Sequence, residues 1–216
     1  PDAHEVLRNA GLQAFKLHYF CQALLLNRSL GMKTPILAAA LAVATAPAAF
    51  AADKYMVDPS HAQVIFSYNH LGFSTTWGMF SGWEGEIMFD EADPAGSCVS
   101  VSIPASAMFT GWEQRDGHFS SPALFGFDDT SVVTFTSTAI EVTGDTTANI
   151  TGELTIAGTT APVTLETTFN QKGPNPAAQG AEFVGFTASG TVLRSDYGVD
   201  MAAPAVSDEV MVEISL

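Results

Sequence analysis

From Tyr55 to the end of the chain, apolar and polar residues alternate with a period of two. This alternation is typical of β-strands that bury one face, because successive side chains point to opposite sides of a sheet. We predict about eight strands, at 63–70, 83–89, 99–103, 133–135, 150–156, 163–169, 186–192 and 210–214. No segment with a helical period is long enough for the crossover between parallel strands. The pattern therefore predicts an all-β antiparallel fold, either a sandwich or a closed barrel.

The alternation breaks once, between Pro104 and Asp129. This segment contains the sequence RDGHFSSPALFGF at 115–127, which brings an arginine, an aspartate and a histidine close to several apolar residues. We predict short helices here, with Pro122 at a helix start, because proline is favoured in the first turn. A helical insertion between the strands of a barrel is expected to cap its open end.

The predicted inner faces carry many aromatic side chains. An ordinary packed core would explain them, but a barrel of about eight strands can instead hold one small ligand. Small residues on the same faces favour an internal space, and they are Gly85, Gly152, Ala188 and Gly190. The inner-face aromatic residues are Phe66, Tyr68, Trp83, Phe89, Phe135, Phe169 and Phe186.

The first 51 residues differ in character from the rest. Residues 32–51 combine Lys33, an apolar run and the motif Ala49-Phe50-Ala51, and they are predicted to be a cleaved secretory signal peptide. Residues 1–31 precede Met32, which can itself start translation, and are predicted to be an upstream segment outside the fold. An amphipathic helix over 6–26 is the alternative. The predicted barrel domain is 52–216.

The charge of the chain excludes several kinds of partner. The formal net charge is −15, and only 4 basic residues stand against 21 acidic ones after Ala51. Binding to nucleic acid or to an anionic membrane surface requires clustered lysine and arginine. We therefore expect no nucleic-acid partner and no stable membrane insertion.

Candidate catalytic groups are few. The sequence after Ala51 holds only three histidines, His61, His70 and His118, and neither an HExxH nor a GxSxG motif. His61 and His70 are too far apart along an extended strand to share a metal ion, so no metal site is predicted. Asp116 and His118 lie two positions apart and could form an acid–base dyad.

Two arginines are predicted to need anionic partners. Arg115 is expected to pair with Asp116 and so fix the end of a helix. Arg194 falls on the inner face of the strand that contains Phe186, near an end of the barrel. A buried arginine is expected to bind a carboxylate, such as that of Asp116, or the head group of a ligand.

Four stretches in order along the chain resemble the YceI-like, polyisoprenoid-binding secreted proteins. The segment 115–127 matches their Arg-Asp-x-His motif, with Phe119 and Ser120 in place of the usual Leu-Arg. That replacement removes a positive charge near the predicted tunnel mouth. The other stretches are YMVDPSHAQVIFSYNHLGFSTTWGMFSGWEGEIMFD (55–90), GELTIAGTTAPVTL (152–165) and GFTASGTVLRSDYGV (185–199).

The resemblance implies an extended, lipocalin-like antiparallel β-barrel in the periplasm. Its apolar tunnel would hold a polyprenyl lipid or a ubiquinone-like quinone as ligand, without a cofactor, and a homodimer is left open. The predicted ligand-binding residues add His70, Phe119, Leu124, Phe125 and Arg194 to the seven inner-face aromatic residues.

The resemblance thus implies a protein that carries a lipid rather than an enzyme. The alternatives are a periplasmic enzyme that acts on a lipid-like substrate through His118 and Asp116, and an interaction module that binds another protein at an edge strand.

Overall fold

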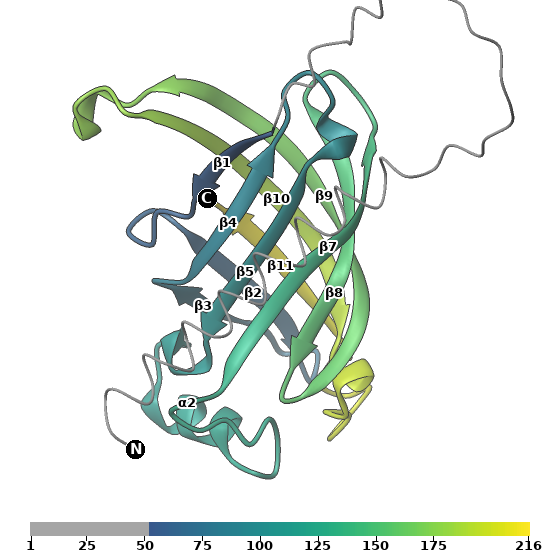
Figure 1. The fold of residues 1–216 in the computed structure, drawn as a ribbon. Helices are drawn as coiled ribbons and strands as arrows, with labels where there is room; N and C mark the ends of the chain where they lie inside the picture. Colours follow the sequence, from purple (N-terminus) through teal and green to yellow (C-terminus); the bar gives the residue numbers. More distant parts are fainter. Residues whose placement is uncertain (1–51) are drawn as a thin grey trace, which may run out of the picture.

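A computed structural model describes residues 52–216 of the chain. These residues form one antiparallel sheet of eleven strands in the order β1-β4-β5-β7-β8-β9-β10-β11-β2-β3-β6 (Figure 1). The predictions for residues 1–31 and 32–51 lie outside the described residues. The strands are β1 (Asp53–Met56), β2 (Gln63–His70), β3 (Ser74–Ser81), β4 (Glu84–Phe89), β5 (Cys98–Pro104), β6 (Met108–Phe109), β7 (Val132–Val142), β8 (Thr147–Ile156), β9 (Thr159–Pro174), β10 (Glu182–Leu193) and β11 (Glu209–Ser215).

The predicted all-β antiparallel fold is confirmed. A strand covers each predicted segment except for Trp83, which precedes β4, and the structure adds β1, β3 and β6. The alternation in β3 is hidden because both of its faces carry apolar residues. Thr76 and Phe80 line the interior, whereas Trp77 lies on the opposite face and is exposed. A period-two pattern detects a strand only when its two faces differ in polarity.

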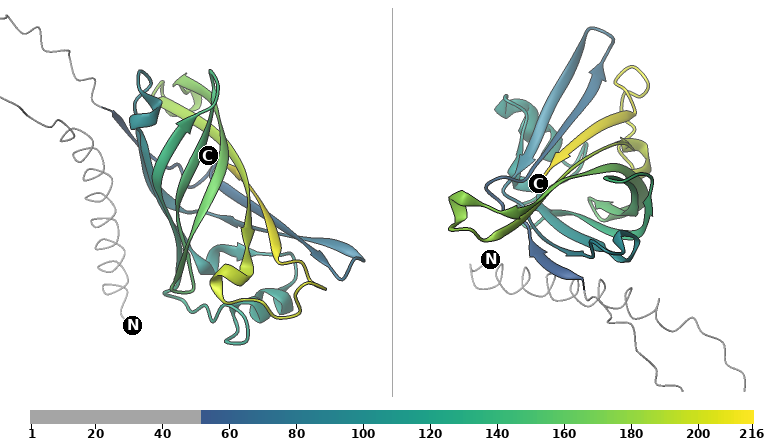
Figure 2. Two further views of the ribbon diagram at one scale, coloured as in Figure 1. Left: turned by 90° about the vertical axis from the view of Figure 1, so that its right-hand side faces the viewer. Right: turned by 90° about the horizontal axis from the view of Figure 1, so that it is seen from above.

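The sheet curls on itself into a barrel-like shape around an internal cavity (Figure 2). Its two edge strands, β1 and β6, form no ladder with each other in the described part of the chain. Instead, β3 and β4, which lie near opposite edges of the sheet, are joined directly by Gly82 and Trp83. Trp83 therefore lies in the short connection between the two sides of the curled sheet, which we call the seam.

Side chains hold β1 against the long hairpin of β9 and β10. Lys172 in β9 lies 3.4 Å from the Asp53 carboxylate, 3.3 Å from Glu91 and 3.7 Å from Glu182. The Tyr55 hydroxyl donates a hydrogen bond of 2.7 Å to Glu182. This cluster connects the edge strand β1 with β9 and β10 in the middle of the sheet. In the part of the chain that the structure describes, these strands form no ladder with β1, so side chains join them to it.

The connections between strands contain one α-helix and four short 3₁₀ helices. The α-helix α2 (Glu113–Ser120) and the 3₁₀ helix η4 (Arg194–Tyr197) lie at the same end of the barrel (Figures 1 and 2). The other 3₁₀ helices are η1 (Pro94–Gly96), η2 (Ala105–Ala107) and η3 (Pro176–Ala178). No helix in residues 52–216 has the length and hydrophobicity needed to cross a bilayer.

The predicted helix start at Pro122 is wrong. The helix α2 ends at Ser120, and Ser121 has an extended backbone with ψ of 154°. A proline disfavours helical geometry in the residue before it, so Pro122 follows the helix that it was expected to begin.

Candidate ligand-binding cavity

The curled sheet encloses a cavity of about 1110 Å³. Its wall is predominantly apolar and consists of side chains from all strands from β2 to β11 and from the segment around α2. All twelve residues that the sequence predicted as ligand-binding line it: Phe66, Tyr68, His70, Trp83, Phe89, Phe119, Leu124, Phe125, Phe135, Phe169, Phe186 and Arg194. The inner faces therefore surround a space rather than a completely filled core.

Aromatic side chains cluster at both ends of the cavity. Phe89, Phe169 and Phe186 pack together with ring centroids 5.4–5.7 Å apart. They lie at the end of β4 that is remote from α2, because α2 follows the opposite end of the antiparallel partner β5. The cavity therefore extends along the strands between this cluster and the α2 segment.

The aromatic cluster at the α2 end connects the sheet to the cap. The Tyr68 ring in β2 contacts Phe119 in α2 with a centroid distance of 6.1 Å. Phe119 packs edge-on against Phe125, and Phe125 stacks on Phe127 with a centroid distance of 5.1 Å. These contacts place α2 over one end of the apolar cavity, as the sequence predicted for the segment that breaks the alternation.

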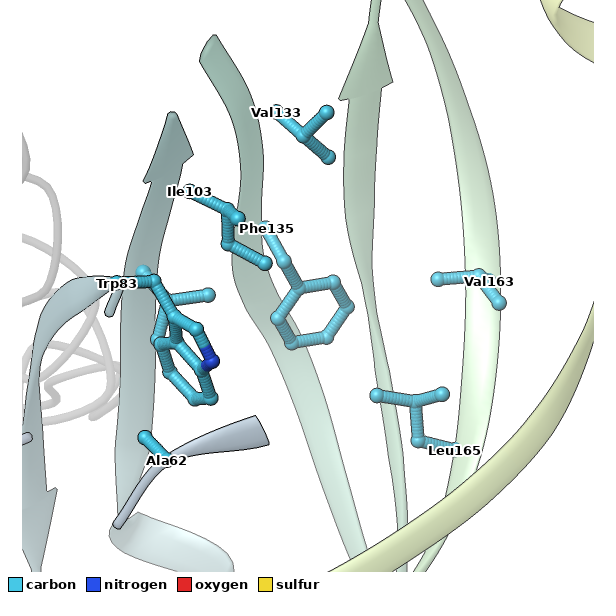
Figure 3. Close-up of a cluster of buried hydrophobic side chains, with 8 residues drawn as sticks. Ala62, Trp83, Ile103, Val133, Phe135, Val163 and Leu165 are labelled. Atoms are coloured by element: carbon cyan, nitrogen blue, oxygen red, sulfur yellow. The ribbon is translucent and has the colours of Figure 1, made fainter. Parts of the chain in front are cut away.

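Between the two ends, a cluster of buried apolar side chains forms the wall. Figure 3 shows Trp83 facing Phe135, with Val163 and Leu165 across from them. Sequence analysis missed several residues of the cavity wall, among them Phe80, Met108 and Phe127. Phe80 belongs to the strand that the pattern hid, and the other two belong to the irregular segment, for which no periodicity defines an inward face.

The inner-face glycines do not provide the cavity space. A Cβ atom on Gly152 would lie 2.4 Å from the Phe135 ring, and one on Gly85 would lie 2.6 Å from the Val101 side chain. Gly190 similarly faces Leu165 at 2.9 Å. Each of these glycines makes room for a bulky side chain of the neighbouring strand, which corrects the prediction that they leave room for a ligand.

The expected ion pair of Arg115 with Asp116 is replaced by a shared contact with Thr110. Asp116 accepts hydrogen bonds from the backbone N–H of Thr110, at 3.0 Å, and from its hydroxyl. Arg115 donates to the Thr110 hydroxyl at 3.0 Å and to its carbonyl at 3.1 Å. The two charged residues fasten the start of α2 to the segment that follows β6, so they anchor the cap as predicted but by a different route.

In residues 52–216 Arg194 forms no ion pair with a carboxylate, which corrects the prediction of Asp116 as its partner. Arg194 is 9% exposed, and its guanidinium group donates four hydrogen bonds to the backbone carbonyls of Ser207, Val199, Met201 and Val206 at 2.7–2.9 Å. Its charge acts on a neighbouring carboxylate, because hydrogen bonds from Ser195 and, to a smaller extent, the charge of Arg194 lower the pKa of Asp208. The four hydrogen bonds hold the loop 198–208 in place, although the Arg194 side chain lines the cavity.

In residues 52–216, no hydrogen bond joins the side chains of His70 and His118 to each other or to Asp116. His61 lies outside the main cavity, where its Nδ1 contacts Asp58 at 2.8 Å. Hydrogen bonds from Ser60 and then from His61 lower the pKa of Asp58 to about 2. His70 and His118 line the cavity, but Oδ1 of Asp116 is engaged by Thr110 rather than by His118. Within residues 52–216, no group of His, Cys, Asp or Glu side chains could hold a metal ion.

A single antiparallel sheet curled around an apolar cavity, with a helical cap, defines a lipocalin-like binding fold. The YceI-like domain model matches residues 55–216, and the chain belongs to this family. A UPF0312 protein of Pseudomonas savastanoi pv. phaseolicola is 36% identical over 170 residues, which cover 78% of this chain and 87% of the relative.

Solved structures share the fold. BcnA of Burkholderia cenocepacia aligns with a TM-score of 0.65 at 24% identity, covering 74% of this chain and 97% of BcnA. A polyisoprenoid binding domain from Saccharophagus degradans aligns with a TM-score of 0.53 at 13% identity, covering 76% of this chain and 96% of that domain. The fold is thus one that occurs in a lipid-binding protein.

Proposed function

We propose that this protein is a periplasmic carrier that holds an isoprenoid lipid, of the polyprenyl or quinone type, in its cavity. The observation that carries the proposal is the apolar cavity of about 1110 Å³, which extends along the strands between two aromatic clusters. Sites for drug-sized ligands typically have volumes of about 300–1,000 Å³, so this cavity suits a somewhat larger molecule.

The chemistry of the wall fits an apolar chain. Removing apolar surface from water contributes about 25 cal/mol per Å², so a long hydrocarbon chain gains affinity along its whole length without charged contacts. The two arginines that line the cavity, Arg115 and Arg194, are bound to protein groups. The family membership and the fold shared with a polyisoprenoid binding domain support the same class of ligand.

Binding rather than catalysis fits the polar groups of the cavity. The dyad on which an enzyme would depend requires a free Asp116 carboxylate beside His118, but that carboxylate fastens α2 to Thr110. Export to the periplasm is proposed from the signal-peptide pattern at 32–51.

A pair of variants on β10 tests the proposal. Ala188 lines the cavity, whereas the next residue, Ser189, is exposed on the outer face. Ala188→Phe fills part of the cavity and is expected to weaken binding of an isoprenoid quinone at least tenfold in equilibrium titration. Ser189→Phe adds the same side chain outside the cavity and is expected to bind as the wild type does. Equal affinities for the two variants would contradict the proposed site.

A further inference from the structure

A buried hydrogen-bond donor faces the cavity without a protein partner. Trp83 is 1% exposed and lines the cavity at the seam between β3 and β4. Its indole Nε1 is the one buried side-chain N or O atom in residues 52–216 that lacks a hydrogen bond. Figure 3 shows this nitrogen on the side of the indole ring that faces Phe135.

An unpaired donor at this position requires an explanation. Buried polar groups in folded proteins almost always have a partner, and a buried tryptophan usually places its N–H where one is available. Trp83 belongs to a cluster of buried apolar side chains that includes Ala62, Val101, Ile103 and Phe135. No protein acceptor in residues 52–216 lies within hydrogen-bond reach of its Nε1, and an occupant of the cavity can supply one.

The charges around the cavity restrict the chemistry of that occupant. Arg194 uses four of its five N–H groups on backbone carbonyls, and Arg115 uses two of its five on Thr110 in the cap. Trp83 itself belongs to the cluster of buried apolar side chains. A single N–H donor in an apolar wall matches one uncharged oxygen acceptor.

We propose that Trp83 donates a hydrogen bond to an uncharged oxygen of the bound lipid, as in a quinone carbonyl or a phenol hydroxyl. The polar ring of the ligand then lies inside the cavity beside Trp83 rather than at its mouth. This inference rests on the proposed function and narrows its ligand class from isoprenoids in general to those with a neutral, oxygen-bearing head group.

The substitution Trp83→Phe tests the proposal because it removes the donor and keeps an aromatic ring. The measurement is the ratio of affinities for an isoprenoid quinone and for squalene, an isoprenoid hydrocarbon without an acceptor. We expect this ratio to fall about fivefold in Trp83→Phe, as the loss of one neutral hydrogen bond predicts. Phe135→Leu changes the apolar wall and is expected to weaken both ligands alike, leaving the ratio unchanged.

A second readout does not depend on a variant that folds well. In the wild type, the Trp83 indole N–H resonance is expected to move downfield with the quinone and not with squalene. An unchanged affinity ratio together with the same resonance position for both ligands would overturn the proposal and assign the N–H to water. If neither ligand binds, the proposed function itself fails, and the two failures are thereby distinguished.

A separate observation concerns the outside of the molecule. Among residues 52–216, seven of the eleven exposed large hydrophobic residues lie on the β2–β3 hairpin, on β6 and β11 beside it, at the start of α2 and in the loop after η4. We call this surface the hairpin end, and its residues are Leu71, Phe73, Trp77, Phe109, Trp112, Met201 and Met211. Phe73, at the turn of the hairpin, is 90% exposed. Figure 2 shows the hairpin projecting from the barrel.

The hairpin end adjoins the cavity. Trp112 and Met201 both line the cavity and are 55% and 45% exposed, so they mark its mouth. The Leu71 backbone N–H donates to the Ala205 carbonyl at 2.9 Å, which joins the tip of the hairpin to the loop that contains Met201.

The hairpin lacks the acidic character of the molecule. Between Asp58 and Glu84, the 25 residues 59–83 contain no Asp, Glu, Lys or Arg, although the chain has a net charge of −15. Exposed apolar patches mark interaction sites, and aromatic side chains favour the interface between water and lipid. The uncharged hairpin with Leu71, Phe73 and Trp77 matches a zwitterionic bilayer, whereas acidic residues such as Glu209 and Glu213, on either side of Met211 on the exposed face of β11, would be repelled by anionic lipid.

We infer that the hairpin end docks reversibly on the surface of a zwitterionic lipid bilayer, with the cavity mouth beside the membrane. The test is flotation of the purified protein with phosphatidylcholine vesicles. We expect Phe73→Ser combined with Trp77→Ser to lower the partition coefficient at least tenfold, because two exposed aromatic side chains lose their burial in lipid. Met56→Ser removes an exposed apolar side chain on β1, at the other edge of the sheet, and is expected to float as the wild type does.

Failure to float, or equal losses in the Met56 and hairpin variants, would overturn the inference. A dimer in sedimentation that the hairpin variants abolish would instead assign this face to a second copy of the chain. Extracting each sample with solvent and measuring the bound lipid keeps docking separate from the proposed carrier function, because the ligand can be present or absent in either case.

Discussion

At the scale of single residues, the charged side chains at the α2 end of the barrel are held by the backbone and by a hydroxyl group. Arg194 donates to four carbonyls, and Arg115 and Asp116 both bind Thr110. The sequence places Arg194 on an inner face, but it cannot reveal the carbonyls, because every residue has one and only the loop conformation brings four of them together.

Arg194→Lys tests the structural role of this arginine. A lysine ammonium cannot reproduce the planar donor geometry that reaches four carbonyls, so buried acceptors are left without partners. We expect a loss of about 2–4 kcal/mol in the free energy of unfolding, measured by denaturant titration, and faster proteolysis within 198–208. A loss below about 0.5 kcal/mol, the range typical of surface substitutions, would contradict this role.

The inner-face glycines lead to a second prediction at this scale. A Cβ atom on Gly152 would lie 2.4 Å from the Phe135 ring and 2.6 Å from the Thr136 carbonyl oxygen. Gly152→Ala is therefore expected to destabilise the protein by about 1–3 kcal/mol in denaturant titration. Gly173→Ala is the matched control, because nothing lies within 4 Å of its Cβ position in β9. Similar stability of the two variants would show that Gly152 is not constrained by packing.

At the scale of elements, the alternation predicts the strands and most of the cavity wall. Residues such as Phe135 and Phe169 could be assigned to the inner face because a polar residue stands on each side of them. The strand β3 escaped prediction because Trp77 is apolar although it is exposed. Trp77 is part of the exposed hairpin end, so its apolar side chain does not mark a buried face of the strand.

The cap provides the prediction for this scale. Asp116→Ala removes the carboxylate that accepts two hydrogen bonds from Thr110, so that only Arg115 still binds Thr110 from α2. We expect a loss of about 1–2 kcal/mol in the free energy of unfolding and faster release of the bound lipid, measured by exchange with labelled ligand. An unchanged release rate would show that α2 does not control access to the cavity.

At the scale of the whole molecule, the curl of the sheet is held by the cluster around Lys172. Burial alone would lower the pKa of Lys172, but hydrogen bonds with Tyr55, Glu91 and Asp53 outweigh it and raise the pKa above its usual value of 10.5. A raised pKa in the folded state means that the stabilisation is present below pH 10.5 and is lost as the pH rises through the folded-state pKa.

Lys172→Met is therefore expected to lower Tm at neutral pH and to flatten the decline of stability above about pH 10.5. The measurement is Tm as a function of pH for the wild type and the variant. Parallel curves for the two proteins over the alkaline range would show that Lys172 does not join β1 to the β9–β10 hairpin.

The central claim concerns what occupies the cavity. The most direct measurement is mass spectrometry of a solvent extract of the protein purified from a bacterial periplasm without detergent. The account predicts an isoprenoid lipid with a neutral, oxygen-bearing head group at close to one molecule per chain, and far less of it from Ala188→Phe. An extract without lipid, from a protein that also takes up no isoprenoid quinone on incubation, would contradict the account.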